Sequence, residues 1–280
     1  MTLSNFNESL KKYAELAVDI GVSVKPGDTV YVQISVDQAQ LARLIVAAAY
    51  QRGAAEVQVQ WFDDVLKRLD MAHMADERLF NIPAFVKGQF DYWVDHQAKR
   101  ITVVSSDPDN LAGIDSNRIA KYQEAFAKAY KRLMEAISSM SISWTIIGAA
   151  SPRWAQKVFP DAATPEEATE LLWEAIFKTT RIDQPDPEAA WKAHDQKLRE
   201  KAAWLNNEQF DQLHYMAPGT DLVVGLPKNH IWEGAGAFNP RGEEFMANMP
   251  TEEVFTAPDF RRIDGTVVST KPLSYGGNIL

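Results

Sequence analysis

The chain has 280 residues, of which 46% are hydrophobic and 24% are charged, and its formal net charge at pH 7 is -9. This length and hydrophobic content suffice for one large core or two smaller ones, so a folded enzyme of one or two domains is expected. The acidic balance disfavours nucleic acid as a partner because lysine and arginine supply most of the affinity for phosphate, and the absence of cysteine excludes disulfides, thiolate metal sites and a cysteine nucleophile.

Neither a membrane span nor a secretory signal is recognisable in the sequence. No apolar run approaches the ~18 to 20 residues that are needed to cross a bilayer. The first residues, MTLSNFNESLKKYAEL, have no apolar stretch after a basic segment and instead lead into an amphipathic helix. We therefore expect a cytoplasmic protein with no membrane partner.

The first half of the chain alternates predicted helices and strands. Helices are expected over residues 5–20, 37–49 and 117–138, and strands over 29–34, 56–61, 100–105 and 143–148. The strand EVQVQW at 56–61 alternates polar and apolar residues, which is typical of a half-buried strand. This order predicts an α/β fold with a mainly parallel sheet and flanking helices.

The second half begins with two well-marked helix starts. TPEE at 164–167 is a capping box with proline at the first helical position, and DP at 186–187 is a second N-cap followed by proline. After residue 207 the pattern changes to short strands separated by glycine and proline, expected at 212–216, 221–226, 245–249 and 266–269. A domain boundary is therefore placed near residue 184, where an α+β region follows the α/β region.

Common catalytic motifs are missing from the sequence. It contains no P-loop and no GxSxG, and Asn239 stands where a dinucleotide fingerprint needs its third glycine. The α/β half is therefore interpreted as a structural or substrate-shaping layer. The histidines form no HExxH motif and are interpreted as surface or hydrogen-bonded residues; they are His73, His96, His194, His214 and His230.

Three acidic pairs are candidates for metal binding. Those at 63–64 and 107–109 are both interpreted as solvated structure, and the second, which contains a proline, as a turn or helix cap. The third, Glu252 and Glu253, lies between Pro250 and Pro258, which favours an extended backbone with the two carboxylates pointing to opposite sides. Carboxylates can bridge two divalent ions in a hydrolytic site, so both a metal ligand and the commoner surface acidic pair remain open from the residues alone.

Three segments resemble the thermophilic-type metalloaminopeptidases, peptidase family M29: GAGAFNPRGEEF at 234–245, NMPTEEVFTAPD at 248–259 and DGTVVSTKPLSYGGN at 264–278. The resemblance extends from the opening helix to the end of the chain. It implies a homodimeric exopeptidase that removes the N-terminal residue of peptides, with arginine and aromatic residues favoured. It also implies two divalent ions, zinc, cobalt or manganese, that share and activate a water molecule.

The resemblance also implies roles for particular residues. The family uses a glutamate of PTEEVFTAPD as a metal ligand, and the match falls on Glu253, with Glu252 as the fallback. The general base and the other ligands (a glutamate, two histidines, a tyrosine and an aspartate) lie further along the family's chains. They are therefore expected beyond residue 280, so this chain resembles a truncated member that is inactive alone.

The expected domains are an N-terminal α/β domain, residues 1–184, that serves substrate gating and dimer architecture, and the beginning of a metallopeptidase catalytic domain, residues 185–280. The alternative to an enzyme is a non-catalytic α/β module for dimerisation or binding.

Overall fold

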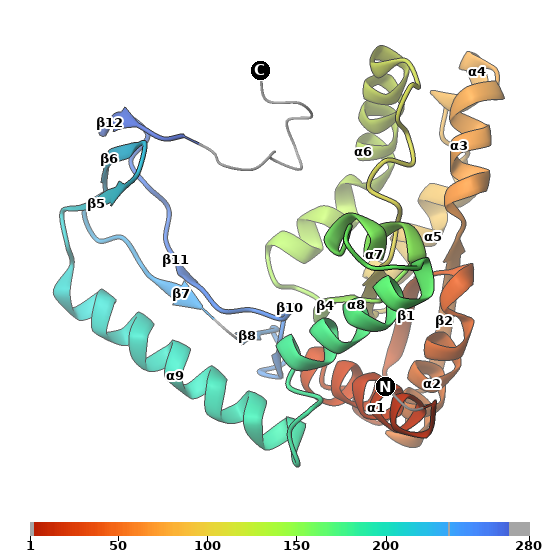
Figure 1. The fold of residues 1–280 in the computed structure, drawn as a ribbon, viewed down its shortest axis with the longest axis horizontal. Helices are drawn as coiled ribbons and strands as arrows, with labels where there is room; N and C mark the ends of the chain where they lie inside the picture. Colours follow the sequence, from red (N-terminus) through yellow and green to blue (C-terminus); the bar gives the residue numbers. More distant parts are fainter. Residues whose placement is uncertain (1–2, 235, 269–280) are drawn as a thin grey trace. The chain divides into compact units, whose positions relative to one another are not determined.

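The computed structural model describes residues 3–234 and 236–268 and separates the chain into two compact units (Figure 1). Unit 1 comprises Met1–Ala193 and Gly236–Thr251, and unit 2 comprises His194–Ala235 and Glu252–Leu280. The chain thus leaves unit 1, returns to it through one short segment and then continues unit 2. The domain limits expected from the sequence, 1–184 and 185–280, stay a prediction.

Unit 1 is built on a five-stranded, entirely parallel sheet in the order β10-β4-β3-β1-β2. Its strands are β1 (Thr29–Ser35), β2 (Glu56–Phe62), β3 (Lys99–Val104), β4 (Trp144–Gly148) and β10 (Asn248–Met249). The sheet and its flanking helices confirm the predicted α/β class. The predicted strand at 245–249 is divided in two, because β9 (Glu244–Phe245) pairs with β8 (Ala237–Phe238) and only β10 joins the sheet.

The first helical layer is formed near the N-terminus. It contains α1 (Leu3–Leu16), which continues as a π-helical turn (Ala17–Gly21), a 3-10 turn (Val36–Gln38) and α2 (Ala39–Gln51). Aromatic rings join α1 to α8 (Pro165–Thr179): the ring centroids of Tyr13 and Phe177 are 5.8 Å apart. The Tyr13 hydroxyl donates to the carbonyl of Gly148 over 2.8 Å, which ties the helix to the end of β4.

A second helical layer covers the other side of the sheet (Figure 1) and contains α5 (Ala84–Asp95) and α6 (Ser116–Ser138). Its core is a stacked pair of rings, Tyr31 from β1 and Trp93 from α5, with centroids 3.6 Å apart. Leu133 and Ile137 of α6 are buried in the same cluster. Alternate residues of β1 therefore face different helical layers, as a strand in the middle of a parallel sheet requires.

Four helices were not expected: α3 (Asp64–His73), α4 (Asp76–Leu79), α5 and α7 (Pro152–Val158). Asp63 caps α3, since its Oδ1 accepts from the backbone N–H of Val65 at 2.8 Å and of Leu66 at 3.1 Å. In the other acidic pair, Asp107 Oδ1 accepts from the N–H of Asp109 at 2.9 Å. The interpretation of the second pair as a turn or cap is confirmed, whereas the cap at Asp63 was not predicted.

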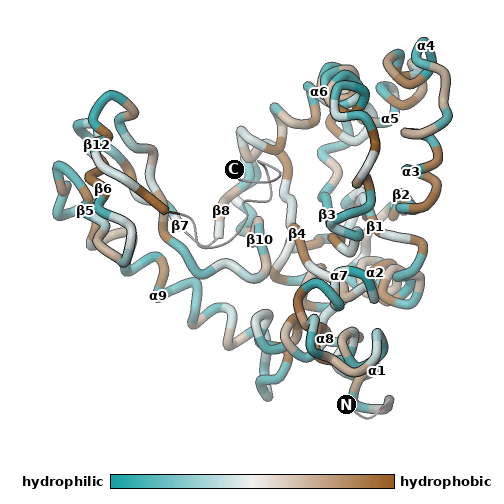
Figure 2. Tube along the Cα trace, turned by 45° about the horizontal axis from the view of Figure 1, so that its top comes forward, coloured by the Kyte–Doolittle hydropathy of each residue, from teal (hydrophilic) through white to brown (hydrophobic). Residues whose placement is uncertain are grey.

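Unit 2 contains most of α9 (Pro187–Glu208) and an antiparallel sheet of β5 (Gln212–Ala217), β6 (Thr220–Gly225) and β12 (Ile263–Thr266). Figure 2 shows α9 as mainly hydrophilic with separate hydrophobic positions, and Ala202 and Leu205 on this helix are buried. The last strand lies earlier than the predicted 266–269, of which Ser269 is outside the described residues. Within the described part of the chain, no helix is long and apolar enough to cross a membrane.

Candidate metal site in unit 2

The acidic pair lies directly before a short strand, β11 (Val254–Phe255), which pairs antiparallel with β7 (Glu233–Gly234). Gly234 stands opposite Val254, and a Cβ at this glycine would lie 2.8 Å from Val254 Cγ1 and 3.0 Å from the carbonyl oxygen of Glu253. Only glycine allows the two strands to approach this closely. The pairing therefore fixes the backbone at Glu253.

Helix α9 holds β7 in place through an amide side chain. Asn206 donates to the carbonyl of Trp232 at 2.9 Å and accepts from its N–H at 2.7 Å. The side chain thus makes the two backbone hydrogen bonds that a neighbouring strand would otherwise make. Trp232 is buried with Ala202, Leu205 and Leu226, and Val254 packs against this cluster. A small core of unit 2 thus supports the strand that follows the acidic pair.

The two glutamates are in different surroundings. Because Val254 packs on the core and side chains alternate in an extended segment, Glu252 shares its side and Glu253 faces away. Glu252 Oε2 lies 3.4 Å from Nε2 of His194 on α9. Glu253 is exposed, and its carboxylate has no hydrogen bond or ion pair to any other described residue. Of the pair, Glu253 is the carboxylate left available to a ligand.

The donor set around Glu253 is incomplete as a metal site. Among residues 3–234 and 236–268, no group of three or more histidine, aspartate or glutamate side chains lies close enough to hold an ion. A catalytic zinc usually takes three protein ligands. The described residues therefore do not fit a complete divalent centre, although Glu253 has the chemistry of one ligand.

Asp259, the last residue of the PTEEVFTAPD motif, is already paired. Its two carboxylate oxygens accept from Arg261 Nε at 2.8 Å and Nη2 at 2.9 Å. Hydrogen bonds from the Arg261 side chain, and then from its backbone N–H, lower the pKa of Asp259 to about 2. This carboxylate is consequently engaged in a local ion pair.

Three of the five histidines make local hydrogen bonds through their rings. His96 Nδ1 lies 2.9 Å from the Tyr92 carbonyl, His230 Nδ1 lies 3.0 Å from the Pro227 carbonyl, and His214 Nε2 lies 2.6 Å from Asp221 Oδ1. His73 is exposed. His194 stands beside Glu252, as described above. The interpretation as surface or hydrogen-bonded residues is confirmed for His73, His96, His214 and His230.

A buried ion cluster, which spacing in the sequence did not reveal, holds the segment Gly236–Thr251 in unit 1. Lys99 is fully buried, with its Nζ 2.8 Å from Asp28 Oδ2 and 3.0 Å from Glu243 Oε2. Arg241 Nη2 lies 3.1 Å from Asp28 Oδ1 and 2.8 Å from Glu243 Oε2. The only local signal was a lysine at the start of a buried strand.

Electrostatics within this cluster favour the ionised carboxylate of Glu243. Burial acts most strongly and raises its pKa, but hydrogen bonds from Asn239 and Lys99, with the charges of Lys99 and Arg241, together lower the pKa below 4.5. Each charged group of the cluster has an opposite partner. The cluster therefore acts as a structural clamp.

The sequence is similar to a known protein family over almost its whole length. The model of the family Peptidase_M29, thermophilic metalloprotease (M29), matches residues 6–280. Aminopeptidase PepS of Streptococcus thermophilus is 52% identical over 280 residues, which are 100% of this chain and 68% of that protein. Aminopeptidase AmpS of Bacillus subtilis is 48% identical over 99% of this chain and 68% of its own length.

A solved structure has the same fold. Wild-type AmpT from Thermus thermophilus superposes with a TM-score of 0.90 at 39% sequence identity, covering 97% of this chain and 67% of that one. The chain thus spans about two thirds of the length of these relatives. A family match over almost all residues, with this identity and this fold, shows that the chain belongs to the M29 family of thermophilic metalloproteases.

Proposed function

We propose that the protein is a metal-dependent aminopeptidase that hydrolyses the N-terminal residue from peptides, and that Glu253 is one ligand of its metal site. The activity is supported by relatives named aminopeptidases that match along the whole chain. The observation that carries the residue assignment is the exposed Glu253 carboxylate, which has no partner among the described residues and directly precedes the β7–β11 pairing. Glu252 is the fallback.

The metal site needs more ligands than the described residues provide. We propose two divalent ions, zinc, cobalt or manganese, since carboxylate oxygens suit such ions. The general base stays unassigned. Because the donor set around Glu253 is incomplete, we expect the 280-residue chain alone to have no appreciable turnover.

Three finer properties belong to the same proposal. We expect arginine and aromatic N-terminal residues to be preferred, a homodimer in solution and a cytoplasmic location. Chromogenic amides of arginine, phenylalanine and aspartate would rank the preference, and sedimentation equilibrium would measure the mass of the assembly. Equal rates for the three amides would remove the preference from the proposal.

A chimera tests the activity and the ligand together. It joins this chain to the part of the Streptococcus thermophilus aminopeptidase that the chain does not match. We expect arginine release from the arginyl amide with added zinc, cobalt or manganese, and no release by the 280-residue chain alone. An inactive but folded chimera would favour the alternative, a non-catalytic α/β module.

Within the active chimera, Glu253→Gln should reduce turnover by more than about 100-fold, because loss even of a group that only supports a metal ligand costs 10- to 100-fold. Glu252→Gln is the matched control, since it makes the same chemical change one residue away and is expected to have the smaller effect. Measured metal content per chain separates lost binding from lost chemistry. A larger loss in Glu252→Gln would transfer the ligand role to Glu252.

A further inference from the structure

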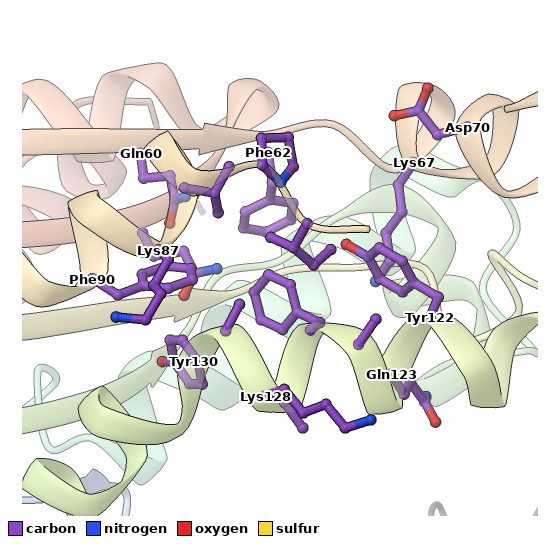
Figure 3. A pocket seen from close by; sticks show the side chains of 18 of the residues that line it. Gln60, Phe62, Lys67, Asp70, Lys87, Phe90, Tyr122, Gln123, Lys128 and Tyr130 are labelled. Carbon is purple, nitrogen blue, oxygen red and sulfur yellow. The ribbon is translucent and has the colours of Figure 1, made fainter. Parts of the chain in front are cut away.

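Unit 1 contains a large open groove beside its second helical layer, with a volume of about 2260 Å³. Figure 3 shows its aromatic walls, which include Phe62 from β2, Phe90 from α5, and Tyr122 and Tyr130 from α6. Pockets for small molecules usually measure about 300 to 1,000 Å³. A groove of this size and openness suits an extended chain better than a compact ligand.

The floor of the groove is polar, although it is one face of a parallel sheet. Gln33 on β1 is in register with Gln60 on β2 and Thr102 on β3, and all three line the groove. Two residues earlier on each strand, and therefore on the same face, Tyr31 is in register with Arg100. Parallel sheets covered by helices normally carry apolar side chains on both faces. A polar strip at this place weakens the packing of the core. Such departures from the usual pattern are expected at functional sites, so the strip indicates a role in binding.

The side chains of the strip leave several of their hydrogen-bond donors unused. The amide oxygen of Gln60 accepts from the Tyr31 hydroxyl at 2.9 Å, and that of Gln33 accepts from Arg100 Nη2 at 3.2 Å. Their amide NH2 groups donate to no described residue. The Thr102 hydroxyl and Arg100 Nε are enclosed without a hydrogen-bond partner in the described chain. Several donors of the strip therefore have no hydrogen-bond acceptor among the described residues.

Arg100 is the main charge of the strip, and no carboxylate among the described residues pairs with it. It is half-buried, with its guanidinium carbon 5.8 Å from the centre of the Tyr130 ring. The preceding residue, Lys99, points away from this face and is matched by two carboxylates. A half-buried guanidinium without an anion is costly, and this cost would be removed by a bound carboxylate, which arginine binds in a bidentate manner.

The charged side chains that line the groove also favour a negatively charged ligand. Seven basic and five acidic side chains line the groove, whereas the whole chain has a net charge of -9. Two of the basic groups on the wall, Lys67 and Lys121, have no carboxylate partner in the described structure. A negatively charged ligand is therefore favoured at this place on an acidic protein.

We propose that the groove binds an extended peptide whose C-terminal carboxylate pairs with Arg100. The peptide main chain accepts hydrogen bonds from the Gln33 and Gln60 amides. Its last apolar side chain packs against the partly exposed ring of Tyr130. This binding is independent of the proposed hydrolysis, because it uses only groups of unit 1.

The test uses the 280-residue chain and a fluorescein-labelled hexapeptide of leucine and phenylalanine with a free C-terminal carboxylate. The label blocks the N-terminus, so aminopeptidase action cannot alter the probe. We expect saturable binding in fluorescence anisotropy, and weaker binding of the same peptide as a C-terminal amide by about 10- to 100-fold, the value of charge-assisted hydrogen bonds. A peptide amide with an internal glutamate distinguishes a side-chain carboxylate from a terminal one.

Arg100→Gln should abolish the difference between acid and amide, and Arg100→Lys should retain part of it. The matched control is Arg132→Gln, since Arg132 lies on α6 outside the groove lining, where it pairs with Asp95. Thermal unfolding checks the fold, and a purely structural Arg100 would show itself as a lower Tm with unchanged peptide affinity.

Three results would overturn the proposal. They are equal binding of the acid and the amide, undiminished binding to Arg100→Gln, and tighter binding of the internal glutamate than of the terminal carboxylate. Sedimentation velocity tests a different occupant of the groove, a second copy of the chain. If Arg100→Gln converts a dimer to a monomer and leaves peptide affinity unchanged, the groove is an interface between two copies of the chain instead.

Discussion

The charged side chains of the segment Gly236–Thr251 and the carboxylate of Glu253, which follows it, have opposite surroundings. In the first region, Arg241 and Glu243 join Lys99 and Asp28, and each charge has a partner within 3.1 Å. In the second region, Glu253 is exposed with no partner among the described residues. The contrast separates charges that hold the fold from charges that are available to a ligand.

The same distinction applies to two consecutive residues of β3. Lys99 is enclosed and matched by two carboxylates, whereas Arg100 lines the groove without one. A buried cation that is matched on all sides contributes only while its partners remain. An unmatched one lowers stability until a ligand binds. Substitutions of a matched and of an unmatched cation should therefore change the free energy of unfolding in opposite directions and by different amounts.

The largest effect on stability is expected for Lys99→Met, which removes the buried ammonium and keeps most of the side-chain volume. It leaves Asp28 and Glu243 with Arg241 as their remaining counter-ion in the cluster, and breaking a buried pair costs about 3–5 kcal/mol. Urea denaturation of the purified chain measures this loss. The control is Lys128→Met on α6, whose pair with Glu124 is exposed and worth about 1 kcal/mol or less.

Equal losses in these two variants would contradict the assignment of the cluster as a clamp. The loss of stability would then come from replacing any lysine by methionine, and not from removing an ammonium that is buried between two carboxylates.

A smaller effect is expected for Asn206→Ala on α9. The variant loses both hydrogen bonds to the backbone of Trp232 and leaves these groups without partners, which costs about 1–3 kcal/mol. Because β7 supports the pairing with β11, hydrogen exchange at the amide of Val254 should also accelerate. Asn207→Ala is a control on the same helix. Unchanged exchange at Val254 would show that β11 does not depend on α9.

Much of unit 1 was predictable because its strands carry local signals. The β-branched run of β1 and the alternation of β2 predicted both strands within a residue of their observed ends. In contrast, α3 was missed although it is amphipathic: it has only ten residues, and it exposes Val65 and Leu66 while it buries Met71, so its apolar positions do not form one buried face. Its N-cap residue, Asp63, was interpreted only as part of a solvated acidic pair and not as a cap.

The parts of the site that could not be predicted depend on contacts between distant residues. Arg241 and Asp28 are 213 positions apart, and no spacing rule connects them. Strand β10 has two residues and joins the sheet only through β4. The extended backbone at Glu253 was predictable from its flanking prolines, but its role came from family resemblance, since one exposed carboxylate has no local mark of a metal ligand.

The smallest expected effect is the pH dependence of the stability that Glu243 contributes. It tests whether a matched carboxylate stabilises the fold through its charge. The pKa of Glu243 is lowered below 4.5 in the folded chain, although burial acts most strongly and in the opposite direction. A depressed pKa contributes stability at pH values above 4.5, and this contribution is lost as the pH falls through the lowered pKa. Wild type and Glu243→Gln should therefore differ most in free energy of unfolding near pH 7 and converge in acid.

Glu8 provides the control, because Lys12 also lowers its pKa, through a hydrogen bond, but the carboxylate is exposed. Glu8→Gln should change the free energy of unfolding little at any pH, since solvent screens exposed pairs. Urea denaturation of the three proteins from pH 7 down into the acid range gives the comparison. A gap between wild type and Glu243→Gln that stays constant over this range would mean that Glu243 acts through hydrogen-bond geometry, which glutamine disturbs at every pH, and not through its charge.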